Sequence, residues 1–139
     1  MKFYVPMIPP TVTAQMHKVD ARGRKPRFYD PPELVAAKSK LEAHLAKHRP
    51  EAPMSGPVYL FVMWGFPITG EHEDGEFKTS RPDTDNLQKA LKDVMTKLGF
   101  WKDDAQVAFE PTVKVWAANP GLYVIVDELP KSYPDWRGA

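Results

Sequence analysis

Apolar and polar positions along the chain predict elements in the order β-α-β-α-β-β. The nearly continuous apolar run VYLFVMWGF at residues 58–66 is typical of a central strand that is covered on both faces. The looser alternation over 2–8 indicates another strand, and Pro6 places it near a sheet edge or shortens it. Two further strands are expected over about 106–117 and 122–129, joined as a hairpin by the turn residues AANPG.

Two other segments carry apolar residues at helical spacing. Pro32 suits the first turn of a helix that runs to about His48. A second helix is expected from about Asp85 to Leu98, with Gly99 as its left-handed stop. The apolar stripes are Leu34, Ala37, Leu41 and Leu45 on the first helix, and Leu87, Leu91, Val94 and Leu98 on the second. Two helices against a small mixed sheet make an α+β domain.

Length and composition fit one domain with a real core. The 139 residues are 42% hydrophobic and include no cysteine, which excludes disulfides and thiolate zinc sites. We expect the domain to occupy residues 1–129, with a C-terminal tail at 130–139. The first ten residues, MKFYVPMIPP, resemble neither a signal peptide nor a membrane span, so a cytoplasmic protein is the expectation.

The charges are distributed unevenly. Residues 1–49 carry ten Lys or Arg against four Asp or Glu, whereas residues 50–139 carry nine against fourteen. A basic half suits contact with a polyanion, although chance surface charge is the simpler alternative. The segment 11–31 has no apolar period, and we interpret it as a long loop. Its basic residues are candidates for contacts with a phosphate backbone, or simply a solvated loop tip: Lys18, Arg22, Arg24, Lys25 and Arg27.

Two acidic pairs flank the second predicted helix. Asp83 and Asp85 stand at its start, and a helical wheel places Asp85 and Lys89 together on the face away from the core. Taken alone, these residues are explained by helix capping and by an ion pair one turn apart. Arg81, just before them, is a candidate phosphate clamp or an ordinary surface residue.

The second pair, Asp103 and Asp104, favours a metal site. Four carboxylates near one another repel, and a hard divalent cation such as Mg²⁺ relieves that repulsion. An EF-hand is excluded, because Leu87, Gln88 and Val94 occupy the positions that such a loop needs for a ligand, glycine and glutamate. The chain after the helix is long enough to return within one subunit, and closure across a dimer is the alternative.

The segment PDTDNLQKALKDVMTKLGFWKDDAQV at residues 82–107 resembles the RusA family of Holliday junction resolvases, endonucleases associated with phages. The resemblance implies a homodimer that binds branched DNA, and Mg²⁺ as the cofactor with Mn²⁺ as a substitute. It further implies that Asp103 is secondary. The metal ligands and the essential lysine that it implies are Asp83, Asp85, Asp104 and Lys89. Pro82 departs from the family, in which a basic residue often precedes the first aspartate.

The resemblance implies a Mg²⁺-dependent, structure-selective DNA endonuclease that resolves Holliday junctions by paired symmetric nicks, in recombination and repair. Phosphodiester hydrolysis needs an activated water and neutralised charge, which carboxylate-held Mg²⁺ supplies, and Lys89 adds a positive charge. Two alternatives stay open: a non-catalytic module that binds branched DNA, and a nuclease that acts on other branched DNA.

Overall fold

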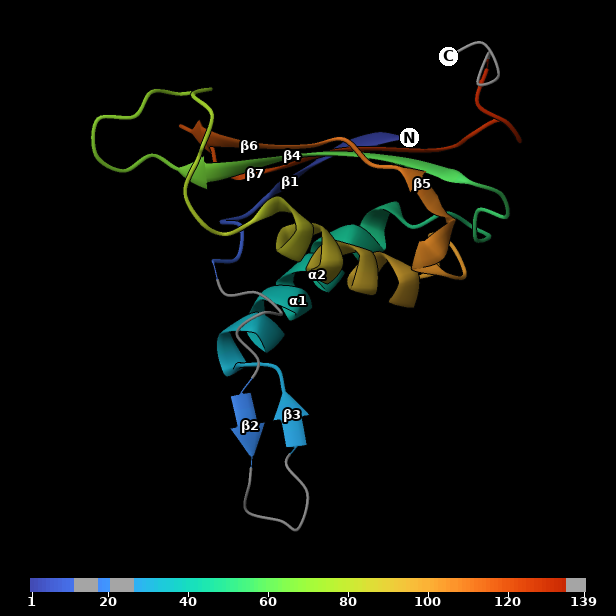
Figure 1. Ribbon diagram of the computed structural model, residues 1–139, viewed down its shortest axis with the longest axis horizontal. Helices are drawn as coiled ribbons and strands as arrows, with labels where there is room; N and C mark the ends of the chain where they lie inside the picture. Colours follow the sequence, from blue (N-terminus) through green and yellow to red (C-terminus); the bar gives the residue numbers. More distant parts are fainter. Residues whose placement is uncertain (12–17, 21–26, 135–139) are drawn as a thin grey trace.

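In the computed structural model, which describes residues 1–11, 18–20 and 27–134, a five-stranded sheet forms the frame of the molecule (Figure 1). The main elements are β1 Lys2–Pro6, α1 Pro32–Leu45, β4 Val58–Pro67, α2 Thr84–Lys97, β5 Val107–Phe109, β6 Thr112–Ala117 and β7 Gly121–Glu128. The 3₁₀ turn η2 Ala46–His48 extends α1, and η3 Asp104–Gln106 precedes β5. The expected α+β class is confirmed.

Strand β4 lies at the centre of the sheet. Along one edge it pairs antiparallel with β7, and β7 in turn pairs with β1. Along the other edge it pairs in parallel with β5 near Val58 and with β6 from Val62 onward. Strand β1 is therefore an edge strand, as Pro6 predicted, because proline cannot donate a hydrogen bond to a second neighbour.

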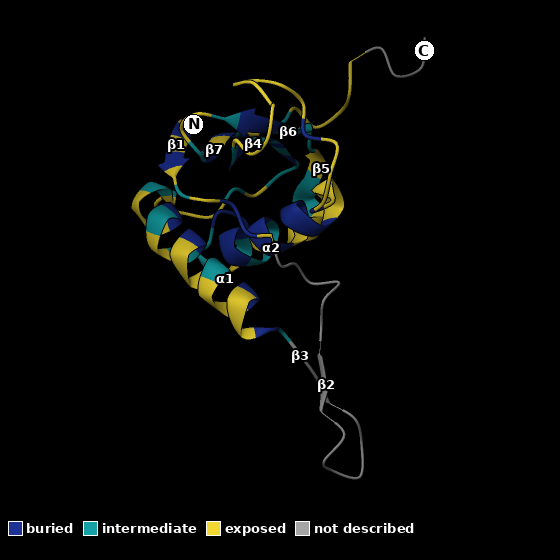
Figure 2. Cartoon of the chain, turned by 90° about the vertical axis from the view of Figure 1, so that its left-hand side faces the viewer, coloured by how far each residue is buried: buried dark blue, intermediate teal, exposed yellow. Residues whose placement is uncertain are grey.

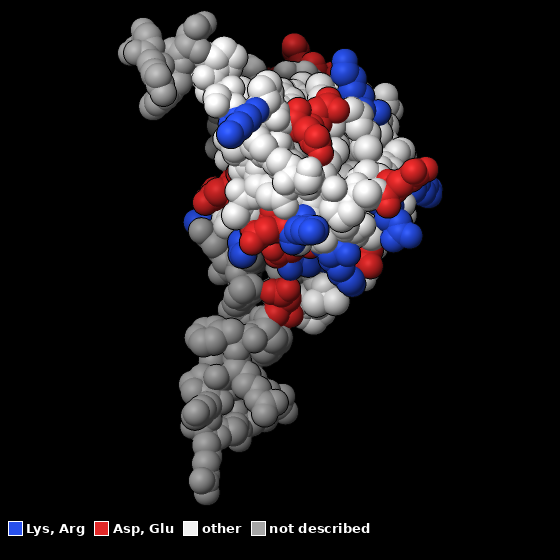
Figure 3. Space-filling view, turned by 90° about the vertical axis from the view of Figure 1, so that its right-hand side faces the viewer, with Lys and Arg blue, Asp and Glu red and all other residues white. Residues whose placement is uncertain are grey.

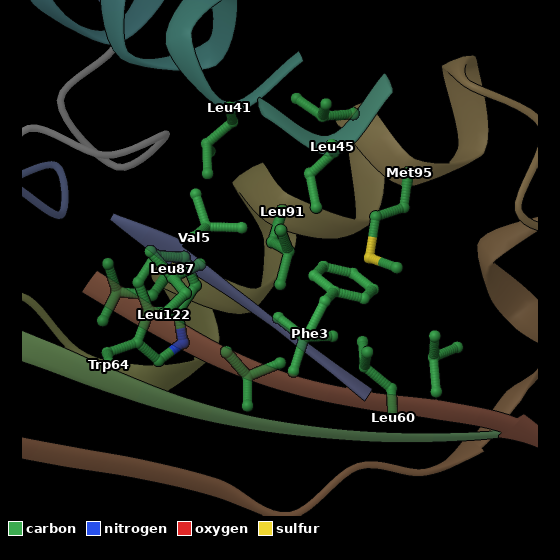
Figure 4. Packing of buried hydrophobic residues seen from close by; sticks show 14 of the residues in the cluster. Phe3, Val5, Leu41, Leu45, Leu60, Trp64, Leu87, Leu91, Met95 and Leu122 are labelled. Atoms are coloured by element: carbon green, nitrogen blue, oxygen red, sulfur yellow. The ribbon is translucent and has the colours of Figure 1, made fainter. Parts of the chain in front are cut away.

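Both helices pack on the same face of the sheet (Figure 1). Their buried residues line the sides that face the sheet, whereas the outer sides are exposed (Figure 2). Leu60 and Trp64 of β4 are completely buried there, together with Leu87 and Leu91 of α2 (Figure 4). Burying such side chains contributes about 1.5–3 kcal/mol each, so this interface holds the helices in place.

Among the described residues, no helix combines the length and apolarity needed to cross a bilayer.

The predicted helices are confirmed, and their ends have local causes. Pro32 occupies the first helical position of α1, where its missing N–H costs no hydrogen bond. Helix α2 ends beside Gly99, whose φ of +82° lies in the left-handed region. The predicted stripe residues are buried except for Ala37 and Leu98, which are partly buried.

The predicted hairpin between the last two strands is wrong. Strands β6 and β7 flank β4 on opposite edges instead of pairing with each other. The long apolar β4 satisfies its backbone groups on both edges, and a local turn signal cannot reveal this competition. The connecting loop is held by the Tyr4 hydroxyl, which donates to the carbonyl oxygens of Asn119 and Pro120. Gly121 is required there, because a Cβ would lie 2.5 Å from the Val5 carbonyl oxygen.

Two further expectations about the strands need correction. The segment 11–31 is not entirely a loop, because β2 Lys18–Asp20 pairs with β3 Arg27–Tyr29 in a separate sheet. Three-residue strands are too short to produce a recognisable period. The expected strand over 106–117 is divided into β5 and β6 at Glu110 and Pro111, because proline interrupts the ladder.

Strand β4 is covered by helices on only one face. On the other face, Tyr59, Phe61 and Met63 are partly buried. Their cover comes from aromatic neighbours on the same face: the Tyr59 ring centroid lies 5.2 Å from that of Phe109, and the Phe61 centroid lies 6.4 Å from that of Tyr123. The apolar run thus reflects lateral aromatic contacts, and the expectation of two covered faces is wrong.

Replacing Gly99 by alanine tests the end of α2. We expect Gly99→Ala to lower the free energy of unfolding by about 1–2 kcal/mol, since a side chain disfavours the left-handed conformation. Gly56→Ala is the matched control, because a Cβ at either glycine meets nothing within 4 Å but only Gly99 has positive φ. Urea unfolding measures both variants, and equal stabilities would contradict the assignment.

Candidate functional site

The first acidic pair lies at the N-terminal end of α2. Asp83 is the N-cap residue, with extended backbone angles, yet its side chain makes no capping hydrogen bond. Asp85 lies in the first turn, and both side chains are exposed. Neither carboxylate has a hydrogen bond or an ion pair within the described chain. Capping therefore does not account for Asp83, and the oxygens of both residues are available to a ligand.

Lys89 follows one turn after Asp85 on the exposed side of α2. The buried residues on the opposite side, Leu87 and Leu91, confirm the predicted helical wheel. The Lys89 ammonium and the Asp85 carboxylate do not form an ion pair in the described structure. The alternative explanation by an ion pair one turn apart therefore does not hold, and the ammonium of Lys89 is also available to a ligand.

Two lysines hold the backbone just before Asp83, and we call them the lysine clamp: Lys78 and Lys114. The Lys78 ammonium donates to the Ser80 hydroxyl at 2.5 Å and to the Arg81 carbonyl oxygen at 2.7 Å. The Lys114 ammonium donates to the carbonyl oxygens of Ser80 at 2.7 Å and Pro82 at 2.8 Å. Three successive carbonyl groups are therefore held by two cations. No sequence motif marks either lysine, so neither is predicted as a site residue.

Aromatic rings enclose the Lys78 ammonium. It lies 5.2 Å from the centroid of Phe66 and 4.6 Å from that of Trp116, and the residue is only 9% exposed. Burial, followed by the nearby Lys114 ammonium, lowers the pKa of Lys78 below its usual value. The oxygen acceptors and the aromatic faces favour the charged form and oppose that shift.

The second acidic pair divides into a structural and a free residue. The Asp103 side chain caps η3 by accepting a hydrogen bond from the Ala105 N–H at 2.8 Å, and the Gln106 side chain completes the capping box. Gln106 also donates to the carbonyl oxygens of Met54 and Gly56, which anchors this turn beside the start of β4. Asp104 is exposed and has no side-chain partner among the described residues.

The two acidic pairs lie at opposite ends of α2 in one subunit. The helix has 14 residues and so spans about 20 Å. The register of the sheet gives the same separation. Val58 of β4 pairs with Val107, which follows Asp104 closely, and Trp64 pairs with Lys114, which holds the backbone before Asp83. Val58 and Trp64 lie about 20 Å apart along the extended strand. Within the described ranges, no three acidic or histidine side chains are close enough to share a metal ion.

Closure within one subunit, one of the two predicted arrangements, is therefore not formed. Residues 100–104 do not run back along α2 after Gly99, and the chain returns only later, through β5 and β6. Instead, the Phe100 N–H donates to the Met95 carbonyl oxygen, and Trp101 donates through Nε1 to the Thr96 hydroxyl. These bonds hold the turn at the C-terminal end of the helix, so Asp104 of the same subunit lies far from Asp85.

The predicted DNA-binding residues are only partly placed. Arg81 is exposed, and its carbonyl oxygen is bound by the lysine clamp. Lys18 and Arg27 belong to β2 and β3, which project beyond α1 on the side away from the main sheet (Figure 1). Their side chains, like the whole of Arg22, Arg24 and Lys25, lie outside the described residues. The surface nearest β5 mixes both signs of charge around an uncharged area (Figure 3).

The chain belongs to the RusA family, because the family described as "Endodeoxyribonuclease RusA" matches residues 7–127. A protein of Lactococcus phage r1t, named crossover junction endodeoxyribonuclease, is 35% identical over 76% of this chain and 80% of its own length. The uncharacterized protein YqaN of Bacillus subtilis is 28% identical over 78% of this chain and 83% of its own. The Escherichia coli K12 protein named crossover junction endodeoxyribonuclease RusA is 60% identical over 35% of this chain and 42% of its own.

The adjacent residues Asp103 and Asp104 should differ in their effect on stability. Asp103→Ala removes the η3 cap, and we expect a loss of about 0.5–2 kcal/mol of unfolding free energy. Asp104→Ala removes no described contact, and its effect should stay within about 0.5 kcal/mol. Thermal and urea unfolding compare the two variants, and the reverse order of stabilities would refute these roles.

Proposed function

We propose that this protein is a divalent-metal-dependent endonuclease that cuts four-way DNA junctions by paired symmetric nicks. The observation that carries the proposal is the pair of carboxylates at the N-terminal end of α2, Asp83 and Asp85, which have no side-chain partner among the described residues. Membership of the RusA family, with relatives named crossover junction endodeoxyribonucleases, supplies the substrate class. The intracellular DNA of recombination and repair is the expected target, which implies a cytoplasmic location.

The donor atoms fit a hard cation. Asp83 and Asp85 offer carboxylate oxygens that no described group engages, and such oxygens are the ligands that Mg²⁺ prefers in proteins. Asp104 is the third proposed ligand, and Mn²⁺ is the expected substitute for Mg²⁺. When bound, the cation supplies water activation and charge neutralisation. Mg²⁺ is commonly held by one or two carboxylates plus phosphate oxygens, so the helix end suits a site that the DNA completes.

The remaining residues act on the phosphate. A water oxygen displaces one ester oxygen from phosphorus, and the leaving oxygen takes up a proton. The exposed Lys89 ammonium, one turn from Asp85, stabilises the negative charge that grows on the phosphate oxygens. Arg81, together with the basic residues at 18–27, holds the backbone of the DNA without reading its bases.

The separation of the acidic pairs favours a site shared by two subunits. A two-fold axis near the middle of α2 would bring the C-terminal end of one helix to the N-terminal end of its partner. Asp104 of one subunit would then join Asp83 and Asp85 of the other, although about 20 Å separates them within one chain. The same symmetry creates two sites, and each site nicks one of two symmetric strands.

Purified protein should cut a synthetic four-way junction into nicked duplexes when Mg²⁺ or Mn²⁺ is added. Asp85→Asn should bind the junction normally but lower the cleavage rate by about 100-fold or more, since it weakens the hold on the cation that would stabilise charge at the reacting phosphate. Gel-resolved cleavage at one salt concentration, with flaps and duplex alongside, measures rate and selectivity.

Glu73→Gln is the matched control for Asp85→Asn. Like Asp85→Asn, this substitution removes one exposed carboxylate from residues 50–139, but Glu73 lies in the loop that precedes Lys78. The control should cleave like the unaltered protein. Failure of the unaltered protein to cut any branched DNA with either metal would defeat the proposed activity, and preferential cutting of flaps would redirect it to another branched substrate.

Mixed dimers distinguish a shared site from one confined to a subunit. Subunits carrying Asp85→Asn and subunits carrying Asp104→Asn should each form inactive homodimers. A heterodimer of the two retains one intact site if Asp104 comes from the partner, because both substitutions then fall in the other site. The heterodimer, purified through two different tags, should therefore nick a single strand of the junction.

The complementary result is equally informative. If each site used Asp83, Asp85 and Asp104 of one chain, both sites of the heterodimer would be damaged and no nicking would appear. Sedimentation analysis of the same sample checks that a dimer is present. A monomer at the concentrations that support cleavage would contradict the two-subunit site.

A further inference from the structure

The backbone that leads into the candidate site is held by cations rather than by a strand ladder. Residues 79–81 are exposed, and the lysine clamp contacts every carbonyl oxygen from Ser80 to Pro82. The clamp itself is fixed: Lys78 donates its own N–H to the Lys114 carbonyl oxygen, and Lys114 belongs to β6. The backbone that enters Asp83 is therefore held by two ammonium groups, whereas Asp83 itself accepts a hydrogen bond from the Leu87 N–H of α2.

The clamp leaves the carboxylates free. Lys78 and Lys114 both bind backbone oxygens next to Asp83, yet among the described residues they form an ion pair with neither Asp83 nor Asp85. Their donors are engaged by backbone and hydroxyl oxygens, and the rings of Phe66 and Trp116 enclose the Lys78 ammonium. The positive charge thus stays near the acidic pair without occupying the oxygens that a metal ion needs.

We infer that Lys78 and Lys114 are positioning residues of the nuclease site, which hold Asp83 and Asp85 in the arrangement that binds the divalent cation. This inference rests on the proposed function. The clamp restrains the segment 80–82 before metal arrives, so less backbone freedom is lost on binding. Its two charges also lessen the repulsion between the carboxylates in the metal-free protein.

Lys114→Met tests the inference, because it removes the ammonium but keeps an unbranched side chain. We expect Mn²⁺ binding, measured by electron paramagnetic resonance of the free ion, to weaken about tenfold, as when support around metal ligands is lost. The kcat for junction cleavage should fall about tenfold to a hundredfold, with KM little changed. Lys114→Arg keeps a cationic donor and should recover part of the Mn²⁺ affinity.

Lys92→Met is the matched control. Lys92 is also a partly buried lysine, but it pairs with Glu110 at 2.8 Å and does not contact the segment before Asp83. The control should lose stability without any change in Mn²⁺ affinity. Thermal unfolding and sedimentation establish that both variants are folded and in the same oligomeric state. Lys78→Met provides a second test of the clamp and should weaken Mn²⁺ binding in the same direction.

Three outcomes would overturn the inference. Unchanged Mn²⁺ affinity in Lys114→Met would remove the positioning role, and an equal loss in Lys92→Met would reduce it to general stability. Weaker junction binding without metal, with a shallower salt dependence, would instead make Lys114 a phosphate contact. Each outcome assumes that the unaltered protein cuts junctions. If the unaltered protein cuts no junction but binds Mn²⁺ in a manner that depends on Lys114, the proposed nuclease function is refuted. The role of the lysine clamp in metal binding is then still supported.

Discussion

The pairing of β4 along both edges is the constraint on which the rest of the structure depends. One edge is divided between β5, which pairs with β4 at Val58, and β6, which pairs through Lys114 with Trp64. Because Lys114 also holds the backbone just before α2, the segments before and after α2 lie near opposite ends of β4. Helix α2 lies against the face of that strand and bridges the two attachments (Figure 1). Hydrogen bonds that satisfy a central strand thus separate two acidic pairs that lie close in sequence.

The charges around the N-terminal end of α2 form a coherent arrangement. The helix end carries a partial positive charge, and the lysine clamp adds two cations whose donors are engaged by neutral oxygens. Asp83 and Asp85 are exposed and have no side-chain partner among the described residues. The helix dipole favours both carboxylates by about 0.3–1 kcal/mol each, but Asp83 does not make the capping bond, which would contribute about 1 kcal/mol. The pair is well explained as a site that a cation and a phosphate complete.

Local patterns predicted most elements and the exposed face of α2, because the 3.6-residue period and the Gly99 stop are encoded in consecutive residues. They failed where distant segments compete. The turn signal before Gly121 predicted a hairpin, but β4 takes both neighbouring strands. They also could not find the lysine clamp, since Lys78 and Lys114 meet only after β6 has paired with β4.

The family, the two helices and the chemical identity of the acidic residues can all be read from the amino-acid order. Those properties reside in side-chain types and short periods, which need no partner to be recognised. Only the tertiary structure decided that Asp103 is a cap, and that Asp104 lies a helix length from Asp85 in the same subunit. The reason is physical: the position of a free carboxylate is set by the long-range hydrogen bonds of its backbone, and one-dimensional spacing does not contain them.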